Sequence, residues 1–359
     1  MSRALPEHLW NILELARWAP SGDNTQPWRF EILGDEHILV HGFDTRDHVV
    51  YDRDGHASQL AIGALLETMA VAATTQGRQI NIERRPDTSD SHLLFDVRFT
   101  PDNNVAVDPL AASIKTRVVQ RRPMSTRPLT PEQQGVLIGA LPQDFKVRWF
   151  ASRTQKWRLA RFMFDNAKVR LTIPEAYAVH SAVIEWGAQF SEDKIPEQAV
   201  GVDPLTARIM RWAMASWERI TFFNKYLLGD LPPRLQLDLL PGLLCGAHFA
   251  LLAPKPLRGL DDFIAAGRAM QRFWLVATQL GWLIQPEMTP VIFTRYFRRK
   301  LVFSETPGTR ERVGKLNRQL VDLLGESSVE CLFFIGRIGA GPVPKSRSTR
   351  KSVEALLHA

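Results

Sequence analysis

The chain has 359 residues, of which 45% are hydrophobic and 23% are charged. This composition is ordinary for a globular protein and argues against a wholly disordered chain. The 45 Lys and Arg residues outnumber the 38 Asp and Glu residues, which gives a formal net charge of +7. A basic balance favours anionic partners, and a small phosphate-bearing ligand explains an excess of this size as well as DNA does.

The cysteine content and the longest apolar stretch bear on the compartment. Cys245 and Cys331 are the two cysteines of the chain, too few for a disulfide framework or a cysteine-ligated metal centre, and this fits a reducing compartment. Residues 1–10 contain charges and no apolar run, so we expect no signal peptide. The most apolar stretch, residues 242–254, is too short to span a bilayer. We therefore expect a cytoplasmic protein without a membrane partner.

The first hundred residues combine helical and strand patterns. Apolar residues recur at helical spacing near the start and again in a long segment that Gly77 ends, in the position that a helix stop prefers. Apolar runs bounded by turn residues predict strands. The expected elements are helices over 6–18 and 58–75 and strands over 28–33, 37–43 and 93–99.

The rest of the chain continues this mixture. Thr130 is the expected N-cap of one helix and Gly281 is the expected stop of another. Residues 155–240 are expected to be mostly helical, because their Trp and Met residues follow helical spacing. The other expected elements are helices over 109–120, 131–141 and 263–280 and strands over 146–151, 247–252 and 329–337.

Two segments of the chain repeat a glycine spacing. Gly63 and Gly77 are separated by the same interval as Gly267 and Gly281, and an Ala-Thr pair stands at the same place in both segments. Both segments are long apolar helices that lead into a loop. Together with the strand patterns around them, they predict two related α+β halves packed against each other.

Residues 19–28 read Ala-Pro-Ser-Gly-Asp-Asn-Thr-Gln-Pro-Trp and lie between a predicted helix and a predicted strand. One interpretation is a plain helix-to-strand turn anchored by Trp28. The stretch closely resembles the Ala-Pro-Ser-x-x-Asn-x-Gln-Pro-Trp loop of the nitroreductase family, whose members bind FMN. The resemblance implies that the loop holds the cofactor through Pro20, Ser21, Gly22 and Asn24.

A second motif, Arg-Arg-Pro-Met-Ser-Thr-Arg, covers residues 121–127, which we call the arginine turn. It resembles the Arg-Arg-Ser-x-Arg start of the same family with two residues inserted. The resemblance implies that Arg121 or Arg122 and Ser125 hold the FMN phosphate and that Arg127 faces the N1/O2 edge of the flavin. Guanidinium groups bind phosphate in a bidentate way, and a fixed cation near N1 stabilises the reduced flavin. The alternative is a solvated basic turn.

The basic tail over 345–351 follows the last predicted strand. Nitroreductase-like proteins often have a basic residue here that also reaches the phosphate. The resemblance implies Arg347 as the first choice for this role and Arg350 as the second. The alternative is a frayed basic terminus.

The segment that begins Leu280-Gly281 resembles a loop of the family that donates a backbone N–H to flavin N5. Here the stretch Gln285, Pro286 and Glu287 would supply that donor. A hydrogen bond at N5 orients the atom that accepts the hydride. The alternative is a plain helix stop.

The distribution of these motifs predicts the architecture. In ordinary nitroreductases one subunit contributes the Ala-Pro-Ser loop, and the other contributes the arginine turn, the N5 loop and the tail. The resemblance therefore implies an α+β nitroreductase-like fold, with an antiparallel or mixed sheet flanked by helices, in which one chain is its own pseudo-dimer with one FMN site. We expect a first half over 1–105 and a second half over 106–359 that contains a helical insertion at about 155–240.

The helical insertion leaves two interpretations open. Its aromatic and Met side chains form either a packing surface or a lid that shapes or blocks the flavin face. His180 with Glu175 and Glu185 suggests proton transfer, but a lone histidine on a helix is more often structural. We therefore expect no catalytic side chain, because in such enzymes the cofactor carries the chemistry.

The function that we expect is that of an FMN-dependent oxidoreductase. NADH or NADPH would deliver a hydride through FMN to a small organic acceptor or a biosynthetic intermediate. The alternative is a non-catalytic FMN-binding protein with a lid over the flavin. We expect a small-molecule substrate, no metal, no nucleic-acid partner because no recognised module is present, and either a monomeric pseudo-dimer or a homodimer.

Overall fold

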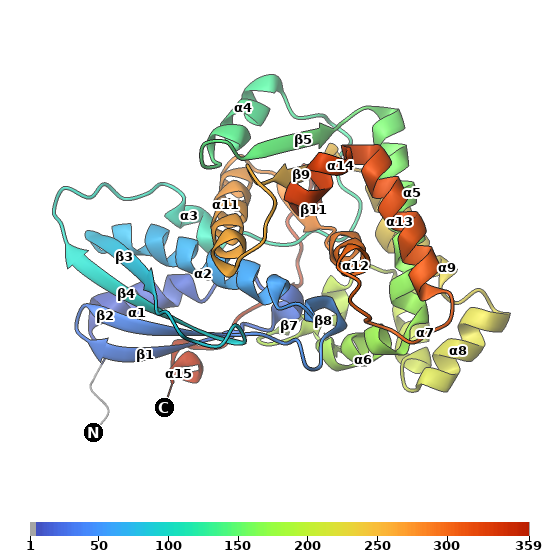
Figure 1. Cartoon of the computed structure of the whole chain (residues 1–359), viewed down its shortest axis with the longest axis horizontal. Coiled ribbons are helices and arrows are strands. Elements are labelled where there is room, and N and C mark those ends of the chain that lie inside the picture. The colour runs from blue at the N-terminus through green and yellow to red at the C-terminus, as the bar shows by residue number, and fades with distance from the viewer. Residues whose placement is uncertain (1–4, 359) are drawn as a thin grey trace.

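Layers of sheet and helix surround one central helix pair (Figure 1). This computed structural model describes residues 5–358. Helices α2 (His56–Thr74) and α11 (Leu260–Gln279) pack against each other. A first sheet lies on the α2 side with its own hydrophobic core, and a second sheet lies on the α11 side with another.

The first sheet has four strands, all antiparallel, in the order β1-β2-β4-β3. Helix α1 (Glu7–Ala16) and helix α2 pack on it and bury Trp28 and Phe30. The sequence did not predict β3, because Ile80 and Ile82 are its only apolar residues. The strands are β1 (Trp28–Gly34), β2 (His37–Phe43), β3 (Arg78–Arg84) and β4 (His92–Pro101).

The second sheet also has four antiparallel strands, in the order β10-β11-β9-β5. Helix α11 packs on one face, and helices α5 (Arg153–Thr172), α12 (Thr289–Arg298) and α13 (Thr309–Leu324) pack on the other. All residues of β9 are buried, which explains its continuous apolar pattern. The strands are β5 (Lys146–Phe150), β9 (Ala247–Leu252), β10 (Leu283–Pro286) and β11 (Leu332–Gly339).

The remaining elements are shorter, and many lie between β5 and β9 in the sequence. The helices are α3 (Ala111–Ile114), α4 (Pro131–Gly139), α6 (Pro174–Val183), α7 (Pro204–Ala213), α8 (Trp217–Tyr226), α9 (Leu231–Arg234), α10 (Leu240–Leu243), α14 (Glu326–Cys331) and α15 (Val353–Leu356). The short strands are β6 (Ile184–Glu185), β7 (Phe190–Ser191), β8 (Ile195–Pro196) and β12 (Arg347–Ser348). Single helical turns are η1 (Gly22–Asn24), η2 (Val50–Asp52), η3 (Glu197–Ala199) and η4 (Leu235–Leu239).

Two glycines allow α2 and α11 to approach each other closely. A Cβ atom on Gly63 would lie 2.2 Å from the carbonyl oxygen of Ile264, and one on Gly267 would lie 2.2 Å from the carbonyl oxygen of Leu60. The contact is reciprocal, because each glycine meets the residue three positions before the other glycine. No side chain larger than a hydrogen fits at either position, so the backbones themselves form the contact.

Most of the elements expected from the sequence are present, and three expectations need correction. The strand expected over 329–337 begins only at Leu332, because the residues before it belong to α14. The helix expected over 109–120 shrinks to α3, because the chain beyond it runs beside β10 and Val119 bridges Ile284. The region over 155–240 is mostly helical as expected, but it also contains β6, β7 and β8. The N-cap role of Thr130 is confirmed, since its side chain accepts a hydrogen bond from the backbone N–H of Gln133.

The predicted α+β class with antiparallel sheets flanked by helices is confirmed by the two sheets. Internal duplication and the boundary between the two halves stay predictions. Helix α2 is long and apolar enough to cross a membrane by length and composition, but 83% of its apolar window is buried inside the protein. It is therefore a core helix of this fold.

The glycine contact predicts that alanine destabilises the protein at Gly63 but not at an uncrowded helical glycine. Gly63→Ala forces the central helices apart, and we expect it to lower the free energy of unfolding by about 1–3 kcal/mol. Gly135→Ala in α4 is the matched control: nothing lies within 4 Å of its Cβ position, and a gain of about 0.5–1 kcal/mol is expected. Urea denaturation followed by circular dichroism measures both. Equal effects of the two substitutions would contradict this account of the helix contact.

Candidate functional site

The loop over residues 20–26 is held in an unusual backbone conformation. Asp23, Asn24 and Gln26 have φ angles of 50°, 62° and 48°, which lie in the left-handed region. The backbone N–H of Gln26 donates to the Ser21 Oγ at 2.9 Å, which closes the loop. Pro20 and Asn24 are buried, whereas Gly22 is exposed. The side chain of Ser21 therefore shapes the loop and is already used as an acceptor.

A segment of the inserted region lies across this loop. We call residues 189–199, from β7 through β8 to η3, the strap. The Asn24 side-chain amide donates to the carbonyl oxygens of Glu192 at 3.0 Å and Lys194 at 3.3 Å. The Gln26 side-chain amide donates to Glu192 at 2.8 Å. The amide groups of the loop thus bind main-chain carbonyls of the strap.

The strap also contacts the arginine turn and the basic tail. Arg122 donates to the carbonyl oxygen of Gln198 at 3.0 Å, and Arg121 donates to that of Ala199 at 3.1 Å. Strand β7 pairs in parallel with β12 of the tail, and the Thr349 N–H donates to Ser191 at 2.7 Å. The strap therefore joins three sequence elements that the motif analysis assigned to one site.

Three arginines gather where the loop meets the tail. Arg350 donates to the carbonyl oxygen of Ala19 at 3.1 Å, and Arg117 donates to that of Trp18 at 3.0 Å. Arg347 donates to the carbonyl oxygen of Arg117 at 3.2 Å and stacks over the Trp18 ring. We call Arg117, Arg347 and Arg350 the arginine cluster.

Among the described residues, the arginine cluster has no carboxylate partner. Within residues 5–358, none of its members forms an ion pair with Asp or Glu, and all of their hydrogen bonds go to carbonyl oxygens. The Nε atoms of Arg117 and Arg347 are buried without a partner. Burial and the neighbouring Arg347 lower the pKa of Arg350 to about 9, and burial with Arg350 and Arg347 lowers the pKa of Arg117. A buried cationic cluster without a counter-ion is suited to an anion such as phosphate.

The stretch predicted to bind flavin N5 is part of the second sheet. Gln285 and Pro286 belong to β10, and the Gln285 amide donates to the carbonyl oxygen of Pro286 at 2.8 Å. The backbone N–H of Glu287 donates to the carbonyl oxygen of Ile335 at 2.8 Å. This N–H is therefore used within the fold, and the role of the stretch in flavin binding stays a prediction.

The Glu287 side chain forms a buried ionic network below the arginine turn. Its carboxylate accepts from His248 Nδ1 at 2.8 Å and from Arg337 at 2.9 Å. Arg337 also donates to the carbonyl oxygen of Arg121 at 2.8 Å, and His248 Nε2 lies 2.8 Å from the carbonyl oxygen of Gly242. Both ring nitrogens of His248 face oxygen acceptors, which is the environment of a protonated imidazole.

The pKa values within this network follow from its geometry. Burial opposes the charge on His248, but the Glu287 carboxylate and the neighbouring Cys245 together outweigh burial and raise the pKa of His248 to about 10. Burial also opposes the charge on Glu287, and His248 and Arg337 together lower its pKa. Nearby, burial raises the pKa of Asp23 against the opposing effect of Arg121. The network anchors the main chain of Arg121, the first residue of the arginine turn.

The other residues named from the sequence have different neighbours. Ser125 and Arg127 are exposed: the Arg127 N–H donates to the Ser125 Oγ, and the Arg127 guanidinium stacks over Trp282. In the described part of the chain, no hydrogen bond joins either residue to the loop. His180 is hydrogen-bonded to the Tyr51 hydroxyl at 2.8 Å, and burial lowers its pKa to about 3, which fits a structural role.

Arg117, the least exposed member of the arginine cluster at 3%, was not among the residues named from the sequence. A signal was available, because Arg117 and Arg121 have the spacing of the first and last residues of Arg-Arg-Ser-x-Arg without any insertion. Valines stand at the two positions between them where the family pattern has Arg and Ser. Aligned without an insertion, the motif would begin at Arg117, four residues earlier.

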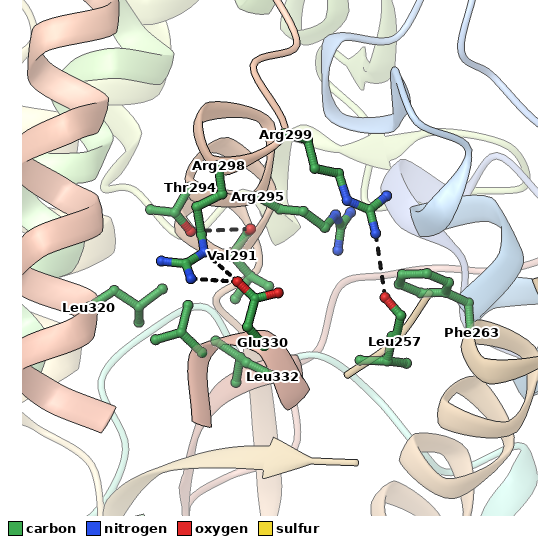
Figure 2. A pocket seen from close by; sticks show the side chains of 11 residues that line it. Leu257, Phe263, Val291, Thr294, Arg295, Arg298, Arg299, Leu320, Glu330 and Leu332 are labelled. Carbon is green, nitrogen blue, oxygen red and sulfur yellow. Dashed lines mark hydrogen bonds and ion pairs between the residues drawn. The ribbon is translucent and has the colours of Figure 1, made fainter. Parts of the chain in front are cut away.

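A separate small cavity of about 50 Å³ lies between α12, α13 and α14 (Figure 2). Figure 2 shows Arg298 pointing toward Glu330 and the Arg299 guanidinium toward the Leu257 carbonyl. Arg295 pairs with Asp54 at 2.8 Å. Two of its three arginines are thus matched by carboxylates, so the cavity is not a strong anion site, and none of its lining residues belongs to the arginine cluster.

Sequence comparison relates the chain to proteins of Mycobacterium tuberculosis. An uncharacterised protein is 31% identical over 156 residues, which cover 42% of this chain and 45% of that protein. Two proteins provisionally named NAD(P)H nitroreductases are 34% identical over 93 residues and 33% identical over 124 residues. These alignments cover 25% and 34% of this chain and 27% and 36% of those proteins.

The chain spans less than half the length of these relatives. Among solved structures, a nitroreductase-like family protein from Bacillus cereus aligns with a TM-score of 0.35 and 11% identity, over 70% of this chain and 96% of that one. No protein-family model matches the sequence.

The ionic network predicts a dependence of stability on pH. The pKa of His248 is raised from about 6.5 to about 10 on folding, so its contribution is full below pH 6.5 and is lost as the pH rises through 10. His248→Gln should therefore lower the melting temperature more at pH 6.5 than at pH 10. The exposed His48 provides the control, because His48→Gln should change little at either pH. A deficit of His248→Gln that is the same at both pH values would contradict a charged His248.

Proposed function

Since this chain belongs to the nitroreductase-like family, we propose that it is an FMN-binding oxidoreductase whose arginine cluster holds the cofactor phosphate. The observation that carries the proposal is the buried cluster itself. Arg117, Arg347 and Arg350 converge without an acidic partner among the described residues, and two of their Nε atoms are unsatisfied. An uncompensated buried charge is costly, so a phosphate dianion would relieve both the charge and the missing hydrogen bonds.

The loop and the arginine turn are proposed to hold the rest of the cofactor. FMN, when bound, supplies the ability to accept a hydride and release it to an acceptor. The side-chain amides of Asn24 and Gln26 are donors that suit the polar edge of a flavin. Arg121 is a fixed cation close to Asp23 of the same loop. In the present conformation these donors bind strap carbonyls. Binding of the ring therefore requires the strap to move outward, which would place it as a cover over the site.

The reductant and the acceptor follow from the family and are part of the proposal. We propose NADH or NADPH as the hydride donor and a small organic oxidant as the acceptor. The residues of this chain would bind and orient these molecules and exclude water from them. We propose no general acid or base in this role, since His180, the candidate considered from the sequence, is hydrogen-bonded to the Tyr51 hydroxyl.

Internal duplication is proposed on the reciprocal contact of the central helices. Leu60 and Gly63 contact Gly267 and Ile264 in the way that equivalent residues of two subunits meet across a two-fold axis. Each of these helices packs beside one of two four-stranded antiparallel sheets. Under this proposal one chain forms one cofactor site, with the loop from the first half and the arginines from the second.

The proposal is tested by titrating the purified protein with FMN and measuring the quenching of flavin fluorescence. Arg117→Gln removes the most buried cation of the cluster, and Arg347→Gln removes a half-buried one. Each should weaken FMN binding about 10- to 100-fold, because one charge-assisted hydrogen bond contributes about 1.5–3 kcal/mol. Arg148→Gln, at an exposed position on β5, is the matched control and should bind as the wild type does.

Circular dichroism shows whether each variant remains folded, and Arg347→Gln keeps the test decisive if Arg117→Gln unfolds. Wild-type affinity in a folded Arg347→Gln variant would contradict a phosphate site at the arginine cluster.

A second candidate function, a non-catalytic FMN-binding protein, is favoured by the bonds of the strap. Four side chains of the loop and the arginine turn donate to strap carbonyls, so a strap that stays over the flavin would shield it from nicotinamide. The double variant Ser348→Ala/Thr349→Val removes two further side-chain bonds, to Lys194 at 2.8 Å and to Ser191 at 3.1 Å.

Stopped-flow bleaching of bound flavin by NADPH and NADH under nitrogen separates the two functions. Rapid bleaching of the wild type supports the oxidoreductase. Bleaching that occurs only in the double variant supports the binding protein with a closed strap.

A further inference from the structure

Helices α7 and α8 carry large apolar side chains that the rest of the protein does not cover. Helix α8 has no buried residue, and helix α7 buries only Ala207 and Ala213. The pair projects from one end of the molecule (Figure 1). The exposed members, which we call the apolar patch, have 45% to 67% of their surface accessible: Leu205, Ile209, Trp212, Phe222, Tyr226, Leu227 and Leu228.

The apolar patch has the spacing of one continuous surface. Leu205, Ile209 and Trp212 recur every three or four residues, so they share one face of α7. Phe222 and Tyr226 share a face of α8, with ring centroids 5.1 Å apart. Trp212 connects the two helices through Phe223 at 5.3 Å. A contiguous apolar surface on a folded protein marks a place of interaction.

Cations surround the apolar patch. Residues 203–228 contain four cations, Arg208, Arg211, Arg219 and Lys225, against the two acids Asp203 and Glu218. The Arg219 guanidinium stacks over Trp212 at 4.8 Å, and the Lys225 ammonium lies 5.1 Å from the Tyr226 ring centroid. Exposed aromatic and aliphatic side chains bordered by Lys and Arg are typical of helices that lie in the interface of an anionic bilayer.

We propose that the apolar patch docks the protein on the surface of a lipid bilayer that contains anionic phospholipids. The charge pattern favours this occupant over a second copy of the chain. A two-fold dimer through the patch would place four cations opposite the same four cations, with only Asp203 and Glu218 on each side to offset them. The proposal departs from our expectation of no membrane partner, because the sequence indicated helices here but not that their apolar faces are uncovered.

Co-sedimentation with large vesicles tests the proposal. The wild type should bind vesicles of phosphatidylcholine with phosphatidylglycerol at least about tenfold more tightly than pure phosphatidylcholine vesicles, and salt should release it by screening. Phe222→Ser/Tyr226→Ser should reduce binding about tenfold or more, because the variant loses two aromatic side chains that would be buried in the bilayer. Trp157→Ser is the matched control: Trp157 is 50% exposed but lies on α5, outside the patch, and this variant should bind as the wild type does.

A second variant and a size measurement complete the test. Arg208→Glu/Arg211→Glu keeps the apolar side chains and should still lose binding to the anionic vesicles. Failure of the wild type to bind these vesicles, or unchanged binding by Phe222→Ser/Tyr226→Ser, would overturn the proposal. Light scattering that shows a wild-type dimer, dissociated by the same double variant and indifferent to vesicles, would also overturn it and assign the patch to a second copy.

Discussion

The backbone contact between α2 and α11 is the constraint on which the rest of the structure depends. At Gly63 and Gly267 the two helices touch without intervening side chains, and this fixes the distance between the two sheets. Because α1 packs on α2, the loop that follows α1 is held at a set position relative to the second sheet. The loop belongs to the first sheet region, whereas the arginines that meet it belong to segments far along the chain. The close approach of the two helices thus brings together residues that are distant in sequence.

The donors of the candidate site have two sets of partners, one at the arginine cluster and one at the strap. The arginine cluster binds carbonyl oxygens and has no carboxylate partner within the described residues, while the loop amides and the arginine turn bind the strap. Carbonyl oxygens satisfy a donor but do not neutralise a charge, so the cluster retains an electrostatic preference for an anion. The strap, in contrast, meets the loop and the arginine turn with neutral main-chain carbonyls, which a ligand can replace. One end of the site is therefore suited to phosphate, and the other end is covered by the protein itself.

Much of the fold followed from patterns in the sequence, and the failures have physical causes. The strands β1, β2 and β9 were expected within one residue of their bounds, because each has a clear apolar run between turn residues. β3 was missed because its outward positions are charged or polar. The helix expected over 109–120 was too long, because pairing of Val119 with Ile284 in the tertiary structure overrides local helical propensity.

The candidate site shows the same division between local and tertiary information. The loop motif named Asn24 for cofactor binding, which stays a prediction, and in the fold Asn24 is a buried polar residue. It could not show that Asn24 donates to strap carbonyls more than a hundred residues away. Arg117 was not named because the motif was aligned to residues 121–127, and Arg347 and Arg350 were named from their position in the tail alone. Convergence of these three side chains is a property of the folded chain and has no signature in a single sequence.

The comparison of FMN with riboflavin is the most direct measurement of the central claim. The two ligands share the ring system and differ by the phosphate, so the ratio of their dissociation constants isolates the anion-binding end of the site. The account predicts one FMN per chain and an affinity for riboflavin at least about a hundredfold weaker, as expected when several charge-assisted hydrogen bonds are lost. Equal affinities for the two ligands, or binding of neither, would contradict it.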